Sequence, residues 1–480
     1  MRPLWKHQEH ALSIGMCVRD LALFMEMGVG KSRTMIEILR RKYAEVNRVR
    51  RTLIFSPIIV CENWKREFAM YSKVNPRDIV VLTGPGKKRI LTLLKELGQD
   101  LNANKIIITN YEAVENDDIF AILTQWNIEI IVCDESQRLK NPDSVRAKKV
   151  VTLADKTQHN YILTGTPILN SSSDIFMQFR ILDRGLTFGK NFYTFRHEYF
   201  EDENARRKGT QGYFPKWVPK AHTFVALQDL ISKSALRVLK SECLDLPPLV
   251  RQVVQAEMST EQKRMYKEMM NEYITWLTTK KEEPRAVVAQ LAVTKALRLQ
   301  QIVTGFAKDE NGSVHRLDSV PRLKVLEELL VDLTPHSKVI VWSMFKENYL
   351  MIAELCNKLG IKYREIHGDI SHKDREQNMK DFRSEPDIKV MIANQAAGGT
   401  GINLVEASYA IYYSKGFKLE DDLQSEARNY RGGSEIHDKV TRIDIVAKGT
   451  IDELITEALA NKQSVADNIL GWNLKEVGSE

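Results

Sequence analysis

The stretch Gly28-Val29-Gly30-Lys31-Ser32 decides how the rest of this sequence is interpreted. It precedes a helical pattern over residues 31–43, and its glycines let backbone N–H groups turn toward phosphate oxygens. Lys31 would add a positive charge at the β- and γ-phosphates, and the Ser32 hydroxyl can hold Mg²⁺. Met25 stands where the strict eight-residue phosphate-loop pattern has glycine. The alternative is an ordinary glycine turn before a helix.

A second element strengthens the nucleotide interpretation. Asp134 and Glu135 directly follow the apolar run at residues 130–133, at the expected carboxyl end of a buried strand, where α/β sheets place ligands. ATP hydrolysis needs one carboxylate on magnesium and another that polarises the attacking water. Asp134 and Glu135 are candidates for these two roles. An isolated Asp-Glu pair is commonly an acidic loop, but this one comes about a hundred residues after a phosphate loop.

Short apolar, β-branched runs alternate with helical patterns, which predicts an α/β fold with doubly wound parallel sheets. The runs fall into two sets, each large enough for a sheet. The region between the two sets lacks this alternation of strands and helices. The first set covers residues 53–55, 79–82, 106–108, 128–133 and 161–163, and the second covers residues 339–342, 363–366, 390–393, 410–413 and 443–446.

The predicted organisation is two domains in 480 residues. The first covers residues 1–240 and has an aromatic and basic insert at about 184–222. The second covers residues 241–480 and has a helical insert at about 257–304, opened by a capping box of Ser259 and Gln262. Pro247 and Pro248 are the best candidate linker, because paired prolines cannot continue a helix or a central strand.

The net charge of +7 permits a nucleic-acid partner without demanding one. Residues 1–240 contain 38 basic and 26 acidic side chains, a net of +12, and the remainder contains 32 and 37, a net of −5. A basic track is therefore expected on the first domain and its insert.

The composition, with 43% hydrophobic and 28% charged residues, excludes wholesale disorder. Five scattered cysteines without a C-x-x-C pair exclude a zinc ribbon and a disulfide scaffold. No apolar run approaches the ~20 residues of a membrane span, and residues 1–20 are too polar for a signal peptide. We therefore expect a soluble protein in a reducing intracellular compartment, the cytoplasm.

Further motifs separate motors from other phosphate-loop enzymes. Residues 163–168 come at the end of a predicted strand. They contain Thr164 and Thr166, small polar residues that are candidates to contact the γ-phosphate and signal its presence. The second set contains a glycine-rich loop at residues 398–404. Beyond it, Arg428 and Arg431 are spaced to share one face of an expected helix. Such a pair taken alone is usually a solvated face, but arginines from a second lobe act as arginine fingers in phosphate-loop motors.

Taken together, these motifs resemble the Swi/Snf-type remodeller ATPases within superfamily two of the helicase-like motors. The resemblance covers residues 4 to 431. It consists of the adenine-reading segment at residues 4–8, motif I at 27–32, motif Ia at 55–57 and 63–68, motif Ib at 108–112, motif II at 134–141, motif III at 163–170, a segment at 235–247 that opens the second lobe, motif IV at 338–345, a loop at 367–368, motif V at 394–404 and motif VI at 424–431.

The resemblance implies two RecA-like lobes that hold ATP between them and DNA across them. The implied roles are catalysis by Glu135, Arg428 and Arg431; ATP binding by Gln8, Gly28, Gly30, Lys31, Ser32, Gly399 and Gly401; Mg²⁺ binding by Ser32 and Asp134; coupling by Gln137, Thr164, Thr166 and Gln424; and DNA binding by Ser56, Pro57, Asn110, Tyr111, His367, Gly368, Asn394 and Gln395.

Three departures from the family pattern concern coupling. Gln137 stands where the family usually has histidine, Ala427 replaces an acid, and Gly432-Gly433-Ser434 follows motif VI. No bromodomain, chromodomain, zinc or nuclease module is visible, so the chain looks like a minimal motor of the phage or bacterial kind.

The insert at 184–222 mixes aromatic residues such as Phe214 and Trp217 with the basic run Arg206-Arg207-Lys208. These aromatics either stack on nucleic acid or form the core of a small helical protrusion.

The sequence thus predicts a monomeric ATP hydrolase that uses Mg²⁺ and translocates on double-stranded DNA, largely independent of DNA sequence and without a membrane. Two alternatives remain: a strand-separating or branch-migrating helicase, and a DNA clamp that uses ATP only as a switch.

Overall fold

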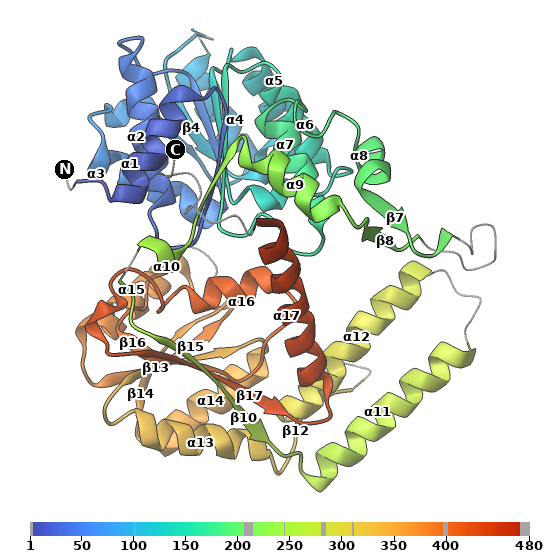
Figure 1. The fold of residues 1–480 in the computed structure, drawn as a ribbon. Helices are drawn as coiled ribbons and strands as arrows, with labels where there is room; N and C mark the ends of the chain where they lie inside the picture. The colour runs from blue at the N-terminus through green and yellow to red at the C-terminus, as the bar shows by residue number, and fades with distance from the viewer. Residues whose placement is uncertain are drawn as a thin grey trace. The chain divides into compact units, whose positions relative to one another are not determined.

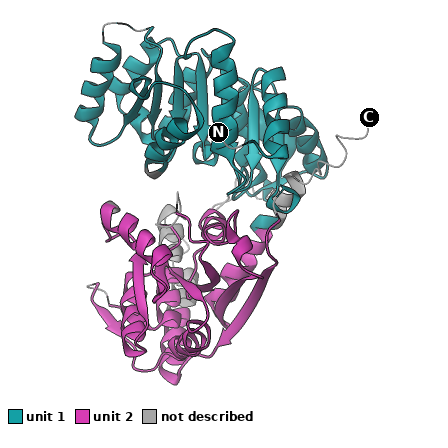
Figure 2. Ribbon diagram, turned by 90° about the vertical axis from the view of Figure 1, so that its left-hand side faces the viewer, with its two compact units in different colours: residues 1–244, 462–480 teal, residues 245–461 magenta. Residues whose placement is uncertain are grey.

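The structure is a computed structural model and describes residues 3–98, 100, 102–205, 215–243, 245–279, 285–309, 312–396 and 402–470. The chain divides into two compact units, shown in different colours in Figure 2: unit 1 holds residues 1–244 and 462–480, and unit 2 holds residues 245–461. Each unit is built on its own parallel sheet, with helices packed over both faces (Figure 1). The predicted α/β class with two doubly wound sheets is confirmed.

Seven strands form the sheet of unit 1, in the order β3-β4-β2-β5-β6-β1-β9, and all neighbouring pairs are parallel. Strands β5, β6 and β1 are consecutive neighbours, so the loops at their carboxyl ends share one edge of the sheet. The strands are β1 Leu21–Met25, β2 Thr52–Phe55, β3 Ile79–Leu82, β4 Ile106–Thr109, β5 Ile130–Asp134, β6 His159–Thr164 and β9 Ala235–Val238.

Both faces of this sheet are buried, as the continuous apolar runs require. Leu53 and Phe55 belong to one hydrophobic cluster and Ile54 to the other, because successive side chains of a strand point to opposite faces. The covering helices are α1 Lys6–Cys17, α2 Lys31–Ala44, α3 Cys61–Tyr71, α4 Gly86–Leu97, α5 Asp117–Gln125, α6 Val145–Ala154, α7 Ile175–Leu182 and α9 Thr223–Ser232.

The insert at 184–222 contains α8 (Phe192–Tyr199) and a hairpin of β7 (Phe200–Asp202) and β8 (Trp217–Pro219). Phe188, Phe195 and Tyr199 are buried in the hydrophobic core of unit 1. The guanidinium of Arg196 lies 4.2 Å from the ring centre of Trp217. For these aromatics the structure favours a protrusion with an aromatic core over base stacking. Tyr213, Phe214 and the basic run at 206–208 lie outside the described residues.

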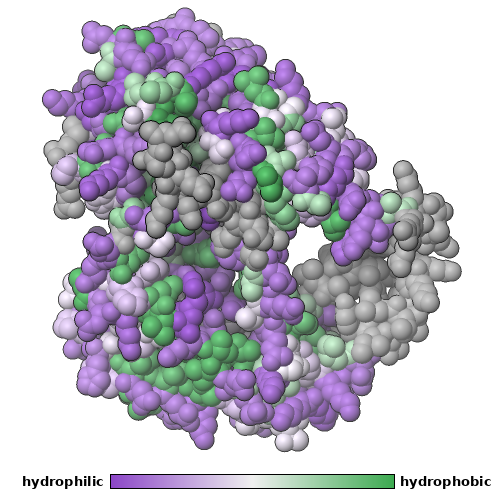
Figure 3. All heavy atoms as spheres, in the orientation of Figure 1, coloured by the Kyte–Doolittle hydropathy of each residue, from purple (hydrophilic) through white to green (hydrophobic). Residues whose placement is uncertain are grey.

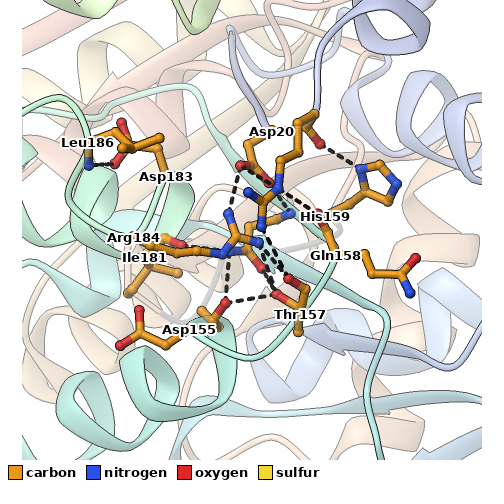
Figure 4. Close-up of polar contacts among 12 residues, drawn as sticks. Asp20, Asp155, Thr157, Gln158, His159, Ile181, Asp183, Arg184 and Leu186 are labelled. Atoms are coloured by element: carbon orange, nitrogen blue, oxygen red, sulfur yellow. Dashed lines mark hydrogen bonds and ion pairs between the residues drawn. The ribbon is translucent and has the colours of Figure 1, made fainter.

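A buried polar network joins the segment after α7 to the amino ends of β1 and β6 (Figure 4). Arg184 donates to the Asp20 carboxylate at 2.7 Å and to the Thr157 carbonyl at 2.8 Å, and Asp20 also accepts from the backbone of Asn160 at 2.7 Å. Burial raises the pKa of Asp20, and the Asn160 hydrogen bond and Arg184 act in the opposite direction. This network holds together the amino ends of β1 and β6, which lie at the end of the sheet opposite the loops that carry the motifs.

The segment at 235–247, which by resemblance opens the second lobe, is divided between the two units. Residues 235–238 form β9, a strand parallel to β1 at the edge of the unit 1 sheet, within the 1–240 range predicted for the first domain, and unit 2 begins at residue 245. The alternating burial of Leu236 and Val238 against β1 explains this pairing. Past the strand, in α10 (Lys240–Cys243), the backbone N–H of Lys240 donates to the Glu26 carboxylate at 2.7 Å.

Unit 2 has a six-stranded parallel sheet in the order β10-β17-β16-β13-β15-β14. Pro247 and Pro248 come immediately before β10, which pairs with β17 along its whole length. The strands are β10 Leu249–Ala256, β13 Lys338–Ser343, β14 Lys362–Ile366, β15 Ile388–Asn394, β16 Ala407–Tyr412 and β17 Val440–Ala447, with a separate antiparallel hairpin of β11 Phe306–Lys308 and β12 Val314–Arg316.

The helices of unit 2 are α11 Thr260–Thr279, α12 Arg285–Thr304, α13 Pro321–Leu333, α14 Lys346–Lys358, α15 His372–Ser384, α16 Leu419–Glu426 and α17 Ile451–Leu470, which continues beyond the boundary of the unit. The predicted helical insert is the pair α11 and α12. Its capping box is confirmed, because Ser259 N–H donates to Gln262 Oε1 at 2.9 Å and Gln262 N–H donates to Ser259 Oγ at 3.2 Å.

Charged side chains are also buried beneath α16. Arg442 pairs with Asp422 at 2.8 Å, Glu426 at 3.1 Å and Asp444 at 3.2 Å, and its guanidinium lies 4.0 Å from the ring centre of Tyr412. This cluster fixes α16 to strands β16 and β17.

Hydrophilic residues cover most of the face of the molecule that Figure 3 shows. Of the helices that the structure describes, none has the length and hydrophobicity to cross a membrane.

Candidate active site

The phosphate loop, residues 28–32, connects β1 to α2. Gly28 and Gly30 have φ angles of 91° and 85°, a left-handed conformation that favours glycine. Gly30 caps α2, whose first turn contains no acidic side chain, so the free N–H groups and the helix dipole favour an anion here. Ser32 is partly exposed in this first turn. The predicted phosphate site therefore has the required backbone geometry.

Helix α1 packs its first turn against this loop. The His7 Nε2 atom lies 2.8 Å from the Val29 carbonyl oxygen, and Gln8 Nε2 donates to the carbonyls of Val29 and Gly30 at 3.4 and 3.5 Å. Gln8 Oε1 accepts from the Trp5 backbone at 3.0 Å. The predicted adenine partner Gln8 is thus beside the phosphate loop, and His7 is a second contact that sequence reasoning did not single out.

Lys31 folds back along the loop. Its Nζ donates to the carbonyl oxygens of Met25 at 2.8 Å and Glu26 at 3.3 Å. The ammonium is therefore held at the carboxyl end of β1, from which it also acts on Asp134.

Asp134 ends β5, the second strand away from β1 in the sheet, and Glu135 follows it directly. Asp134 is buried; its Oδ2 accepts from Trp64 Nε1 at 2.9 Å, and its backbone carbonyl accepts from the Tyr111 hydroxyl at 2.6 Å. Burial and the neighbouring Glu135 raise the pKa of Asp134, while Trp64 and Lys31 act against that rise. Trp64 and Tyr111, which hold the candidate magnesium ligand Asp134, thus come from motifs Ia and Ib. Sequence reasoning missed this role of the two residues.

Glu135 occupies a left-handed conformation with φ of 54°, which is uncommon for a residue with a Cβ. Gln137 Nε2 donates to Glu135 Oε2 at 2.8 Å. Glutamine at this position therefore orients the carboxylate predicted to activate water. Strain of this kind persists only where the surroundings hold it, and it concentrates at functional sites.

Motif III follows β6, the strand between β5 and β1. Thr164 Oγ1 accepts from the Thr166 N–H at 2.9 Å, and the Thr166 hydroxyl is buried with no partner among the described residues. A Cβ added to Gly165 would lie 3.3 Å from the Met25 carbonyl oxygen. Motif III thus touches the residues that lead into the phosphate loop, and the three loops form one site on unit 1.

The candidate DNA residues of unit 1 are largely buried. Ser56 and Tyr111 have no exposed surface and Pro57 is buried as well, while Asn110 is 6% exposed and accepts from Arg89 at 2.6 Å. Contacts to DNA from these positions would have to come mainly from backbone groups. Tyr111 instead supports the acidic loop, as described above.

In unit 2, the four candidates lie at the carboxyl ends of the neighbouring strands β14 and β15: His367 and Gly368 follow β14, Asn394 ends β15, and Gln395 follows it. The ring of His367 stacks on Tyr349 with centres 4.6 Å apart, and Asn394 donates to the hydroxyl of the same Tyr349. Gly368 faces open space, and Gln395 donates to Ser425 Oγ at 3.1 Å. Tyr349 in α14 therefore joins two of these candidates, a role that its place in the sequence did not indicate.

The helix expected for Gln424 to Arg431 is shorter than predicted. Helix α16 ends at Glu426, and Arg428 and Arg431 lie in the following turn. Contacts with the chain at and just before the start of β16 hold this turn: the Arg428 carbonyl accepts from the Leu404 N–H at 2.9 Å, and the Asn429 side chain donates from Nδ2 to the Ala407 carbonyl at 3.2 Å.

The two arginines nevertheless converge. Both donate to the carbonyl of Ile402 in motif V, Arg428 at 3.3 Å and Arg431 at 3.5 Å. Gln424 is buried in α16 and donates to Glu420 at 3.1 Å. Gly399 and Gly401 lie outside the described residues.

Comparison with known families decides between the possible phosphate-loop enzymes. A profile described as the SNF2-related domain matches residues 7–305, and one described as the helicase conserved C-terminal domain matches residues 321–433. The chain belongs to the SNF2-related family. The resemblance to Swi/Snf-type ATPases of superfamily two is thereby confirmed.

Curated relatives of this SNF2-related chain are longer proteins. It is 26% identical over 506 residues to the CHD3-type chromatin-remodeling factor PICKLE of Arabidopsis thaliana, with 99% of the chain and 34% of the relative covered. It is 25% identical over 462 residues to the chromodomain-helicase-DNA-binding protein 1-like of Mus musculus, with 95% and 48% covered. The chain therefore spans about a third to a half of the length of these relatives.

Among solved structures, the SNF2-related chain is similar to the Sulfolobus solfataricus SWI2/SNF2 ATPase core in complex with dsDNA. The two are 22% identical, the comparison covers 98% of this chain and 93% of the other, and the TM-score is 0.43.

Proposed function

We propose that this chain is a DNA-dependent ATPase that translocates on double-stranded DNA. Membership of the SNF2-related family implies the use of ATP. The observation that carries the proposal is the arrangement at the carboxyl ends of β5, β6 and β1. There Glu135 is oriented by Gln137, Asp134 is held by Trp64, and the phosphate loop begins α2.

The residues present fit a magnesium ion bound together with ATP. The Asp134 carboxylate and the Ser32 hydroxyl are oxygen donors of the kind that Mg²⁺ prefers. No group of three or more His, Cys, Asp or Glu side chains suited to a metal is found in the described part of the chain. The phosphates of ATP would therefore complete the ligand set. When bound, Mg²⁺ supplies positive charge that stabilises the phosphoryl group during transfer.

The chain's own residues then divide the work. The phosphate loop and Lys31 bind the phosphates, and Glu135 accepts a proton from the attacking water. The partnerless Thr166 hydroxyl beside this site is a candidate to register the γ-phosphate. Arg428 and Arg431 would offset the charge that grows in the transition state, which is worth roughly 10³–10⁵ in rate for arginine fingers.

The test compares steady-state ATP turnover without nucleic acid and with duplex DNA, single-stranded DNA or RNA. We expect duplex DNA to stimulate turnover most. Glu135→Gln should lower kcat at least about a thousandfold with little change in the KM for ATP, since it removes the general base while leaving the phosphate loop intact. Turnover that duplex DNA leaves unchanged, or that survives Glu135→Gln, would contradict the proposal.

A triplex-displacement assay separates translocation from binding. ATP-dependent displacement of a third strand supports translocation, whereas unwinding of a forked duplex would indicate a strand-separating or branch-migrating helicase. DNA binding that responds to ATP without turnover would indicate a clamp that uses ATP as a switch.

A further inference from the structure

Gln178 lies between two motifs of the ATP site. It belongs to α7, has no exposed surface, and contacts both motif II and motif III. Its Oε1 accepts from the Ser136 hydroxyl at 2.7 Å, and its Nε2 donates to the Pro167 carbonyl at 2.6 Å and to the Asp174 carbonyl at 3.0 Å. One amide thus connects the residue after Glu135 to the end of the Thr-Gly-Thr-Pro turn.

The side-chain amide of Gln178 has the donors and the acceptor that these three hydrogen bonds require. A glutamine side chain offers an acceptor oxygen and two N–H donors, and each donor here has a partner. Ser136 has no exposed surface, and α7 is buried along its whole length. Water therefore cannot replace these partners, and a shift at one end of the bridge must move the other end or break a buried hydrogen bond.

A second bridge runs one helical turn away. Asp174 Oδ2 accepts from the backbone N–H groups of Leu169 and Asn170 at 3.1 and 2.9 Å, and it pairs with Lys140 Nζ at 3.3 Å. Asp174 is the N-cap residue of α7 and Gln178 lies four residues further on, so both bridges start from the same side of this helix. Together they tie both ends of motif II to motif III.

Resting on the function proposed above, we propose that Gln178 is a positioning residue that couples the catalytic carboxylate loop to motif III. Ser136 follows Glu135, and Pro167 follows the turn in which a Cβ added to Gly165 would lie only 3.3 Å from the Met25 carbonyl oxygen, ahead of the phosphate loop. A change at Glu135 when ATP binds or is hydrolysed is passed through the Ser136–Gln178–Pro167 bridge to motif III.

The competing explanation is that Gln178 only stabilises the core. Asn160, at the amino end of β6 in the same sheet, provides a matched control. It has no exposed surface, its Oδ1 accepts from the Thr157 hydroxyl at 2.6 Å, and its Nδ2 donates to the carbonyls of Ala154 at 3.2 Å and Ile181 at 2.9 Å. This amide also bridges a hydroxyl and two carbonyls, but none of these three partners belongs to an ATP motif.

The experiment is a double-mutant cycle in the full chain with Ser136→Ala, Gln178→Met and the combined variant, alongside Asn160→Leu. For each protein, kcat and the KM for ATP are measured with and without duplex DNA, at a temperature below every melting transition, and the melting temperature is recorded. We expect each single bridge variant to lower kcat about tenfold with the KM for ATP within about twofold. The combined variant should be no slower than Gln178→Met, since either change alone already breaks the bridge.

Asn160→Leu should lower the melting temperature as Gln178→Met does while keeping kcat within about twofold. The inference is overturned if kcat losses in the two single variants multiply in the combined one, or if kcat follows melting temperature across all four variants. If duplex DNA does not stimulate the wild type, the proposed function fails, and Gln178 is then judged from basal turnover by the same comparisons.

Discussion

At the scale of single residues, the site depends on positions where one extra atom or one lost partner changes the geometry. Gly30 has the left-handed conformation that starts α2, and a Cβ there would lie 2.2 Å from Gln8 Nε2. Glu135 adopts a similar conformation with its Cβ present, supported by Gln137. The phosphate loop thus needs the absence of a side chain, whereas the acidic loop needs a particular neighbour.

Gly30→Ala should weaken ATP binding at least about tenfold and lower the free energy of unfolding by about 1–2 kcal/mol, through left-handed strain and displacement of Gln8. Calorimetry with a non-hydrolysable ATP analogue and thermal unfolding check both effects. Gly449→Ala is the control: its φ is 70° and nothing lies within 4 Å of the added Cβ, so stability should fall without loss of ATP affinity. Unchanged affinity in Gly30→Ala would contradict the described loop geometry.

The thiols differ in burial, which predicts their reactivity. Cys17 is exposed, whereas Cys61, Cys133 and Cys356 are buried. Burial raises the pKa of Cys61 to about 11 and that of Cys356 to about 12, so few thiolates form near neutral pH. Mass spectrometry after alkylation of the native protein should find Cys17 modified first, and the buried thiols modified only in denaturant. Fast labelling of Cys133, next to Asp134, would mean that strand β5 separates readily from the strands beside it.

At the scale of elements, most strands follow from their sequences because they are short β-branched runs buried on both faces. Among the strands that were not predicted, β1 reads Leu-Ala-Leu-Phe-Met, and β10 at a sheet edge mixes polar and apolar residues. Helix α16 ends at Glu426, and beyond it the Arg428 carbonyl accepts from the Leu404 N–H, a partner outside the helix. Whether these segments form strands, and where this helix ends, depends on which distant segments pack against them. A local sequence pattern does not contain that information.

The buried charges beneath α16 predict a pH dependence of stability. Burial raises the pKa of Glu426, but hydrogen bonding to Arg251 and the charge of Arg442 outweigh it, so the net pKa is lowered. The ionised carboxylate therefore stabilises the fold above its ordinary pKa, and that contribution is lost as pH falls through the lowered value.

Glu426→Gln should accordingly cost about 3 kcal/mol near neutral pH, with a difference from the wild type that shrinks as the pH falls below the ordinary carboxyl range. Chemical denaturation across this pH range measures it. Glu257→Gln, whose side chain is 82% exposed beside Lys263, should be neutral throughout. A loss in Glu426→Gln that is independent of pH would show that packing, and not charge, is responsible.

At the scale of the whole molecule, the phosphate loop, the acidic pair and motif III were predicted from the sequence because each is contiguous. Their supports were not, because Trp64, Gln178 and Tyr349 reach their partners across 70, 42 and 45 residues. Hydrogen bonds between distant segments depend on the packing of the whole unit. The uneven charge along the chain could be read from the sequence, and it leads to a prediction about DNA.

Duplex DNA binding by the full chain should be dominated by phosphate contacts of basic groups. Its affinity is expected to fall at least about a hundredfold between about 50 and 200 mM salt, with little dependence on base sequence. Fluorescence anisotropy with duplexes of different sequence checks this. A flat salt response, or strong preference for one duplex, would contradict a basic track on unit 1.

The parallel pairing of β9 with β1 has a mechanical consequence. The two strands are in register from Ala22–Ala235 to Met25–Val238, and Lys240 is tied to Glu26 just before the chain leaves unit 1. Tension applied along the axis of β9 would load the β1–β9 ladder in shear, so that its hydrogen bonds share the force and do not break one after another. That force is delivered to the strand that ends at the phosphate loop.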